Sequence, residues 1–322
     1  MQFIARTLSA FLSFCFNLAE PVFKLGQKWL GVSRIGWLFV GPNLLIFGLF
    51  TFLPIVINLV YAVTGGVNLM PNQRPFTGME NFAILFECAD YTDLQTCRKD
   101  IFWRAIFNTI QFSLIQVVLM VLFSLATALV LNRKIIGRGF WRGVFFYPVL
   151  LSPVVVALIW KWVLQSQGVF NAGLVAIGST PVDWLTDRSW AFFWVIFVSI
   201  WAHMGFYTLI LLAGLQAIPK DMYEAAEMDA ASPWRTLRRI TLPLLMPALV
   251  SATVFAFVTS FGNITLSVFL GTSGVTTLPV QIFTYVEHNY DPVLAAVSAL
   301  VILVTLVMIV VVEKLVGVEK VA

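Results

Sequence analysis

Charged residues are scarce in this 322-residue sequence. Asp, Glu, Lys and Arg together make up 11% of it, whereas hydrophobic residues make up 60%. A soluble domain is about one quarter charged, so this composition excludes an ordinary water-soluble protein. The long apolar stretches instead indicate helices of about 20 residues that cross a bilayer, where the backbone must satisfy its own hydrogen bonds.

Histidine and cysteine are also rare, with two and three copies. Two isolated histidines and one cysteine near the membrane supply neither a metal cluster nor a nucleophile with its base, so an intramembrane enzyme is disfavoured. We expect no metal site, no cofactor in this chain and no nucleic-acid partner. The sequence also lacks short-period repeats, which excludes a solenoid.

Six apolar stretches have the length of a membrane-spanning helix. The sequence therefore predicts an all-α membrane protein with one transmembrane domain over residues 33–316. Two interpretations stay open for Pro148 and Pro153 in the third stretch, an ordinary kink or a bend around a cavity. The predicted spans are 36–63, 105–131, 143–164, 189–216, 243–263 and 292–312.

Basic residues are distributed unevenly between the loops. They gather in the N-terminal segment, in the second-to-third loop, in loop 217–242 and in the C-terminal tail, whereas residues 264–290 contain neither Lys nor Arg. The positive-inside rule then places both termini and loop 217–242 in the cytoplasm. Cys88 and Cys97 share an extracytoplasmic loop, where they form either a disulfide or two unpaired thiols.

The two chain ends lie outside these spans. Residues 1–32 contain an apolar run that is short for a span, and no small-residue cleavage site follows it. We expect an interfacial helix on the cytoplasmic leaflet, with a seventh span as the alternative. Residues 317–322 are expected to form a cytoplasmic tail.

The loop between the fourth and fifth spans is polar in an otherwise apolar sequence. Pro219 and Asp221 favour the start of a helix. Ala225 and Ala226 leave one side of that helix flat, and Glu224 places a carboxylate beside it. A short helix presented to water between two spans is suited to docking in a groove of another protein. A second short helix is predicted from Ser232-Pro233, and Leu242-Pro243 begins the fifth span.

This loop resembles the cytoplasmic loop of permease subunits of bacterial ABC importers. The shared pattern is Glu224-Ala225-Ala226, position 230 after three residues, Ile240 after nine more, and Leu242-Pro243. The family has Gly where this sequence has Ala230. Because alanine with positive φ costs about 1 kcal/mol, we expect either a negative φ there or a helix that ends one residue later.

The resemblance extends over about residues 36–316 and points to two solute classes. Four segments resemble permeases of the carbohydrate-uptake group, which includes the maltose and glycerol-phosphate importers: 76–82, 102–109, 137–148 and 214–219. Three segments of the last third resemble polyamine-type permeases: 259–263, 277–285 and 295–300.

The resemblance implies a type I ABC importer permease in the bacterial cytoplasmic (inner) membrane. Its implied partners are an ATPase dimer that binds ATP and Mg, a second permease that is often different, and an extracytoplasmic substrate-binding protein. The loop helix would be the coupling helix that docks on the ATPase. The implied coupling residues are the docking core Glu224, Ala225 and Ala226, the turn Asp229 and Ala230, and the anchors Ile240, Leu242 and Pro243.

Polar side chains on three spans are candidates for the substrate path. Ser199, His203 and Tyr207 are four residues apart and so share one helix face. For each candidate the alternative is a hydrogen bond between helices. The absence of acids inside the spans favours a neutral solute such as a sugar over a polyamine. The other candidates are Gln111, Gln116, Thr259 and Asn263, with Asn108 and Ser260 beside them.

A secondary transporter, a channel and an assembly scaffold are the alternative classes for a membrane protein of this composition. A secondary transporter couples to an ion through acids inside the membrane, which the predicted spans lack. A channel or an assembly scaffold is not excluded by composition. Co-purification separates these classes, because only an importer permease should bring down an ATPase subunit.

Overall fold

The computed structural model describes residues 36–316, apart from 69, 92, 272–274 and 289–290, together with Glu20 and Gly31. Apart from those two residues, the predictions for 1–32 and 317–322 lie outside the described residues. Throughout the described ranges the secondary structure is helical, and only isolated β-bridges occur. The fold is therefore all-α, as the composition predicts.

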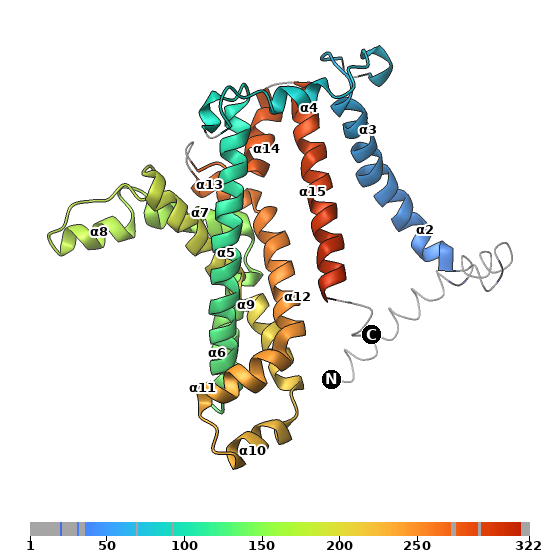
Figure 1. Ribbon diagram of the computed structural model, residues 1–322. Helices are drawn as coiled ribbons and strands as arrows, with labels where there is room; N and C mark the ends of the chain where they lie inside the picture. Colours follow the sequence, from blue (N-terminus) through green and yellow to red (C-terminus); the bar gives the residue numbers. More distant parts are fainter. Residues whose placement is uncertain are drawn as a thin grey trace.

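The first apolar stretch forms one helical rod with a wide turn in its middle. It consists of α2 (Gly36–Phe47), a π-helical segment (Gly48–Phe52) and α3 (Leu53–Ala62). The π-turn ends two residues before Pro54, whose ring would clash with the carbonyl four residues earlier in a regular α-helix. The rod slants away from the other helices (Figure 1), and its α3 end packs on α15.

Two long helices form the centre of the bundle. They are α5 (Asp100–Asn132) and α9 (Arg188–Ala217), and they lie within a few residues of the second and fourth predicted spans. Their shared core includes Met120 and Leu211, both fully buried. α12 (Leu242–Phe261) packs against both helices. Figure 1 shows these helices running along the long axis of the molecule.

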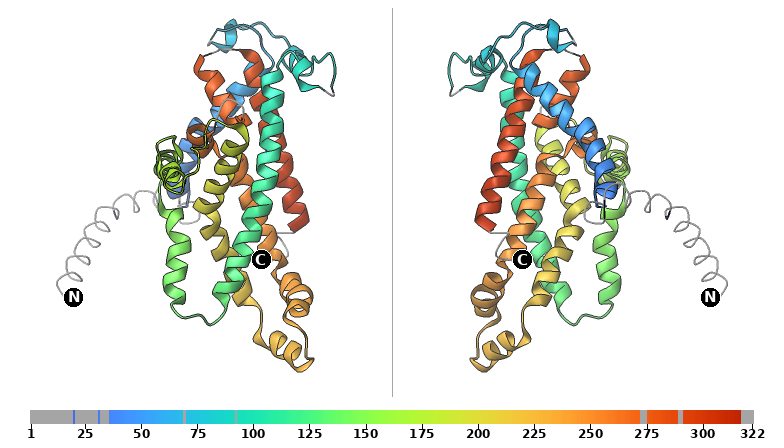
Figure 2. Two further views of the ribbon diagram at one scale, coloured as in Figure 1. Left: turned by 90° about the vertical axis from the view of Figure 1, so that its left-hand side faces the viewer. Right: turned by 90° about the vertical axis from the view of Figure 1, so that its right-hand side faces the viewer.

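The third apolar stretch is broken, so the prediction of one helix over 143–164 is wrong. It divides into α6 (Arg138–Phe146), a 3-10 turn (Tyr147–Leu150) and α7 (Pro153–Leu164). Pro153 has no N–H to continue a helix, and it keeps Ser152 before it in an extended conformation. α7 and α8 (Val169–Ala176) then project sideways from the bundle (Figures 1 and 2).

The polar loop contains the two predicted helices. They are α10 (Lys220–Met228) and α11 (Pro233–Thr236). A π-helical segment (Leu237–Thr241) joins α11 to α12 without a break. The fifth span therefore does not begin afresh at residue 243 as predicted, and its helix ends at Phe261. As in the first rod, the π-turn accommodates a following proline, here Pro243.

Residues 264–290 were expected to form a loop but contain two helices. These are α13 (Ile264–Leu270) and α14 (Leu278–His288). Between the first two apolar stretches lie a short helix, α4 (Glu80–Leu85), and the 3-10 turns Pro71–Gln73 and Leu94–Thr96.

Within the described ranges, five helical segments are long and apolar enough to cross a membrane. They cover 40–62, 100–132, 153–176, 188–217 and 233–261. The last helix, α15 (Pro292–Val316), has 25 residues, of which 292–308 form a shorter apolar stretch. Five of the six predicted spans thus correspond to helices that are long and apolar enough, and the sixth falls on α15, whose apolar stretch is shorter.

Candidate functional sites

Helix α10 projects beyond one end of the bundle (Figure 2). Its outer surface carries Glu224 and Ala225, and Met228 is 84% exposed. Asp221 in the first turn places a negative charge where the helix dipole favours it. The helix thus offers an apolar surface beside a carboxylate, with nothing from the described part of this chain covering it.

The turn after α10 is closed by a left-handed alanine. Ala230 has φ +48°, and the N–H of Ala231 donates to the carbonyl of Ala226 at 2.9 Å. This hydrogen bond is characteristic of a Schellman motif, in which the left-handed position after the helix is usually glycine. The expectation of a negative φ or a helix one residue longer is therefore wrong. The position keeps its left-handed geometry and accepts the steric strain of a Cβ atom.

Helix α10 is fastened to the start of the fifth span. The hydroxyl of Thr241 donates to the hydroxyl of Tyr223 at 3.4 Å. Ala226 is buried, so it packs the loop against the protein and does not face a docking partner as expected. A groove of about 550 Å³ lies at the root of the loop, between α10, Trp234 and the end of α5 at Arg133.

Within the bundle, three of the candidate path residues meet in one hydrogen-bond network. Ser199 of α9 accepts from the amide of Gln116 on α5 at 2.7 Å and from the amide of Asn263 at 2.8 Å. The side-chain amide oxygen (Oδ1) of Asn263 also accepts from the N–H of Leu266 and so caps α13. Gln116 and Ser199 are fully buried. We call Gln116, Ser199 and Asn263 the polar seam.

The next turns of α9 extend this polar line. The imidazole of His203 lies 2.8 Å from the carbonyl oxygen of Ser199 and lines a cavity of about 80 Å³ beneath the break between α6 and α7. One turn further, the hydroxyl of Tyr207 donates to Thr259 at 2.9 Å. The cavity accords with the interpretation that Pro148 and Pro153 bend the chain around a space.

The seven path candidates are therefore not equivalent. Six lie on one connected side of α9 and its neighbours, whereas Gln111 is exposed on another side of α5. The Oε1 atom of Gln116 and the hydroxyl of Ser260 are buried without a hydrogen-bond partner in the described structure. Such groups inside a membrane protein are costly unless water or a solute reaches them.

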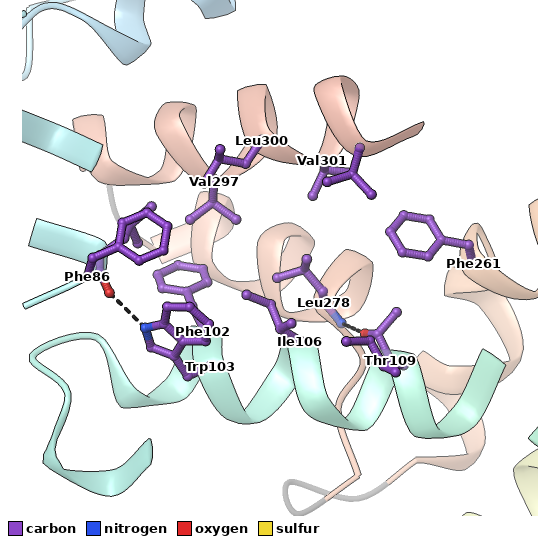
Figure 3. A pocket seen from close by; sticks show the side chains of 13 residues that line it. Phe86, Phe102, Trp103, Ile106, Thr109, Phe261, Leu278, Val297, Leu300 and Val301 are labelled. Atoms are coloured by element: carbon purple, nitrogen blue, oxygen red, sulfur yellow. Dashed lines mark hydrogen bonds between the residues drawn. The ribbon is translucent and has the colours of Figure 1, made fainter. Parts of the chain in front are cut away.

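A separate cavity of about 220 Å³ lies between α5, α14 and α15 (Figure 3). Its lining is apolar, and the few polar atoms are already used. Thr109 accepts from the N–H of Leu278 at 2.6 Å, and the indole of Trp103 donates to the carbonyl of Leu85 at 2.7 Å. This cavity therefore offers no hydrogen bonds to a sugar.

A disulfide and an ion pair stabilise the end of the bundle opposite α10. Cys88 and Cys97 are joined by a disulfide. The ammonium group of Lys99 donates to the carboxylate of Asp291 at 2.6 Å, and Tyr285 donates to the same carboxylate at 3.1 Å. This ion pair was not predicted, although a Lys and an Asp that each precede a long apolar stretch are a signal in the sequence.

The chain belongs to the family of binding-protein-dependent transport system inner membrane components, whose model matches residues 100–316. It is 34% identical over 223 residues to the trehalose/maltose transport system permease protein MalF of Thermococcus litoralis, covering 69% of this chain and 72% of that protein. It is 32% identical to the lactose transport system permease protein LacF of Rhizobium radiobacter, covering 68% and 70%. The chain is thus a transport subunit, as predicted, and not an enzyme.

Among solved structures, the chain is similar to a subunit of a bacterial ABC transporter involved in the import of the acidic polysaccharide alginate. The TM-score is 0.73 with 23% identity, over 90% of this chain and 98% of that one. A second structure of a bacterial alginate ABC transporter, in complex with a pentasaccharide-bound periplasmic protein, gives a TM-score of 0.70 at 22% identity, over 89% and 96%. These likenesses establish the type I ABC permease fold.

Proposed function

We propose that this chain is a permease subunit of an ATP-driven importer that carries a sugar or sugar derivative across the inner membrane. Its partners are an ATPase dimer, a second permease subunit and an extracytoplasmic protein that delivers the solute. The sugar assignment is supported by the relatives, which are named as trehalose/maltose and lactose permeases. ATP and Mg bind to the ATPase and not to this chain.

The observation that carries this proposal is the combination of exposure and attachment in α10. Glu224 and Ala225 face outward, while Tyr223 and Thr241 connect the helix to α12. A force applied to α10 therefore reaches a helix of the bundle core directly. Rigid-body switching between two states needs a path for that force, and the buried Ala226 and the Tyr223–Thr241 contact supply one. We assign the coupling role to Glu224, Ala225, Asp229 and Ala230, with Ile240, Leu242 and Pro243 as anchors.

The membrane topology follows from the same assignment. α10 lies in the cytoplasm, and both chain termini lie on that side as well. α15 is the sixth span, since 25 helical residues are about 37 Å long and exceed the 30 Å hydrocarbon core. The α3–α4 connection, the Cys88–Cys97 disulfide and the Lys99–Asp291 pair then face the extracytoplasmic side.

The polar seam, with His203, Tyr207 and Thr259, is proposed to line the substrate path when α9 and α12 move apart. In the present state its groups bind one another, so the path is closed at this depth. Amides and hydroxyls match the hydroxyls of a sugar. A polyamine would require carboxylates, and neither the seam nor these three neighbours contain one.

The decisive experiment replaces Glu224 with Ala in the reconstituted importer. Transport and substrate-stimulated ATP hydrolysis should both fall at least tenfold, because the docking carboxylate is lost. The matched control is Glu287→Ala, which removes an exposed carboxylate of α14 at the opposite end. Glu224→Ala must still insert in the membrane and retain its permease partner. Unchanged transport in Glu224→Ala would refute the coupling assignment.

A further inference from the structure

Two arginines converge at the end of the bundle from which α10 projects. Arg138 and Arg142 lie one turn apart on α6, and Gln216 lies in the last turn of α9. With its amide oxygen facing them, Gln216 accepts from the Nη2 atom of Arg142 at 2.9 Å and from that of Arg138 at 3.1 Å. Because both guanidinium groups bind one oxygen atom, two like charges are held close together.

No negative charge within the described residues balances this pair. Neither Arg138 nor Arg142 forms an ion pair there, and Gln216 is neutral. The Nε atoms of both arginines are buried and lack a hydrogen-bond partner in the same residues. Two adjacent unneutralised guanidinium groups repel each other, and burial strengthens the repulsion. The arrangement favours binding of an anion that lies outside the described residues.

The backbone at this point adds to the positive potential. α6 begins after Gly137, whose φ is +71° and which has no side chain to cap the N–H groups of the first turn. The N-terminus of a helix carries partial positive charge and disfavours a cation such as Arg138 in that turn. The same N–H groups favour a phosphate, and arginine binds phosphate through two parallel hydrogen bonds.

The exposed side chains around the arginine pair indicate which kind of phosphate would bind there. Ile136, Phe140 and Trp141 beside the pair are exposed, Ile136 by 99%. Aromatic side chains of this kind settle at the boundary between hydrocarbon and headgroups. Figure 2 shows that α6 begins at the same end of the bundle as α10.

We propose that Arg138, Arg142 and the first turn of α6 bind the phosphate of an anionic phospholipid in the cytoplasmic leaflet. The choice of leaflet rests on the topology proposed above, whereas the phosphate chemistry does not. The headgroup would replace repulsion between the arginines with attraction, and it would fix α6 against the end of α9. The bound lipid would thereby help to hold α6, which leads into the turn Tyr147–Leu150 beside the cavity at His203, against α9.

The test titrates the assembled importer in detergent with short-chain phosphatidylglycerol and counts bound lipids by native mass spectrometry. Phosphatidylcholine and inorganic phosphate serve as separate probes. The double variant Arg138→Gln/Arg142→Gln should bind phosphatidylglycerol about 30-fold more weakly, since each basic residue near an anionic headgroup contributes about one kcal/mol. The matched control Arg133→Gln/Lys134→Gln removes two exposed charges from the same loop and should weaken binding less than threefold.

Three results would overturn the proposal. They are equal affinity of the unmodified importer for phosphatidylcholine and phosphatidylglycerol, an equal loss in the control variant, or binding of inorganic phosphate as tight as that of the lipid. Should the glutamine variant fail to assemble, Arg138→Lys/Arg142→Lys retains the charge but loses the paired hydrogen bonds. That variant should show intermediate affinity, and full affinity would contradict the assigned geometry. None of these measurements depends on transport, so failure here leaves the proposed function intact.

Discussion

Lys99, immediately before α5, donates a 2.6 Å hydrogen bond to the carboxylate of Asp291, immediately before α15. The two residues are 192 positions apart in the sequence, and both side chains are 24% exposed. Their contact fixes the N-terminal ends of α5 and α15, which no short loop connects. This pair is therefore a tertiary clamp rather than a surface ion pair of the kind that contributes little.

The two pKa shifts define the pH range of this clamp. Burial alone would raise the pKa of Asp291, but hydrogen bonds from Lys99, the Val293 N–H and Tyr285 outweigh it and lower the pKa. Burial likewise opposes the charged form of Lys99, yet Asp291 raises the pKa of Lys99 above its usual value. The Asp291 contribution is thus present above its unfolded pKa of about 3.9 and lost as pH falls through the lower folded value. The Lys99 contribution is present below about 10.4 and lost as pH rises through the higher folded value.

Asp291→Asn should therefore destabilise the permease at neutral pH by about 1 kcal/mol. Thermal unfolding in detergent, compared between the variant and the unmodified chain, measures the difference. That difference should shrink as the pH falls below about 3.9, where the carboxylate protonates in the unfolded chain before it does in the folded one. The control is Glu87→Gln, which breaks the 60% exposed Arg98–Glu87 pair and should change stability by less than about 0.5 kcal/mol. An Asp291→Asn effect that does not depend on pH would contradict the role of the charge.

Ala230→Gly should stabilise the turn after α10 by about 1 kcal/mol, because glycine adopts positive φ without a Cβ clash. Hydrogen exchange of the Ala231 amide, which bonds to Ala226, measures this locally. The exchange should slow about fivefold. Ala230→Val, with a branched side chain at the same φ, should accelerate it. If glycine accelerates exchange as well, the left-handed geometry assigned to this turn is wrong.

Gly205→Ala should separate α9 from α6. A Cβ atom at Gly205 would overlap the carbonyl oxygen of Phe145, and backbone cannot yield as a side chain can. We expect a loss of about 2 kcal/mol in unfolding free energy, measured from the shift in unfolding temperature. Gly143→Ala on α6 is the matched control, since its Cβ atom meets nothing within 4 Å. That change should be neutral or stabilising, because alanine is the better helix former.

Ser199→Ala should destabilise the polar seam. The amides of Gln116 and Asn263 would both lose their acceptor, which for Gln116 lies at a fully buried position, at a cost of about 1 kcal/mol. Ser251→Ala is the control, because that hydroxyl is exposed and donates only to Pro247 of its own helix. Unfolding temperature reports stability, and solute uptake reports the path. Equal effects of the two substitutions would show that the seam is not a structural unit.

The sequence predicted best what depends on local chemistry. Long apolar runs predicted α5 and α9 to within a few residues, because a bilayer leaves the backbone no alternative to helix. Ser232 was predicted to start a short helix, and its hydroxyl accepts from the N–H of Arg235. The spacing from Glu224 to Pro243 indicated the family that the comparisons show.

The structure differs from the sequence predictions where distant parts of the chain meet. Residues 264–290 were predicted to be a loop, yet α13 and α14 form there because Asn263 caps α13 and the N–H of Leu278 donates to Thr109 of α5. Pro153 breaks the third stretch completely, whereas Pro54 and Pro243 follow π-turns within continuous helices. Composition alone does not distinguish these outcomes, since each depends on which neighbours satisfy the freed carbonyl groups.

The sequence by itself determined that this chain is helical, lies in a membrane and presents a charged helix between its fourth and fifth spans, because burying charge or bare backbone in lipid is too costly. Only the tertiary structure decided which polar groups act together. Gln116, Ser199 and Asn263 converge, as do Lys99 and Asp291, although each set comes from separate helices. Hydrogen bonds and ion pairs act over a few ångströms, so their partners are fixed by packing and not by position along the chain.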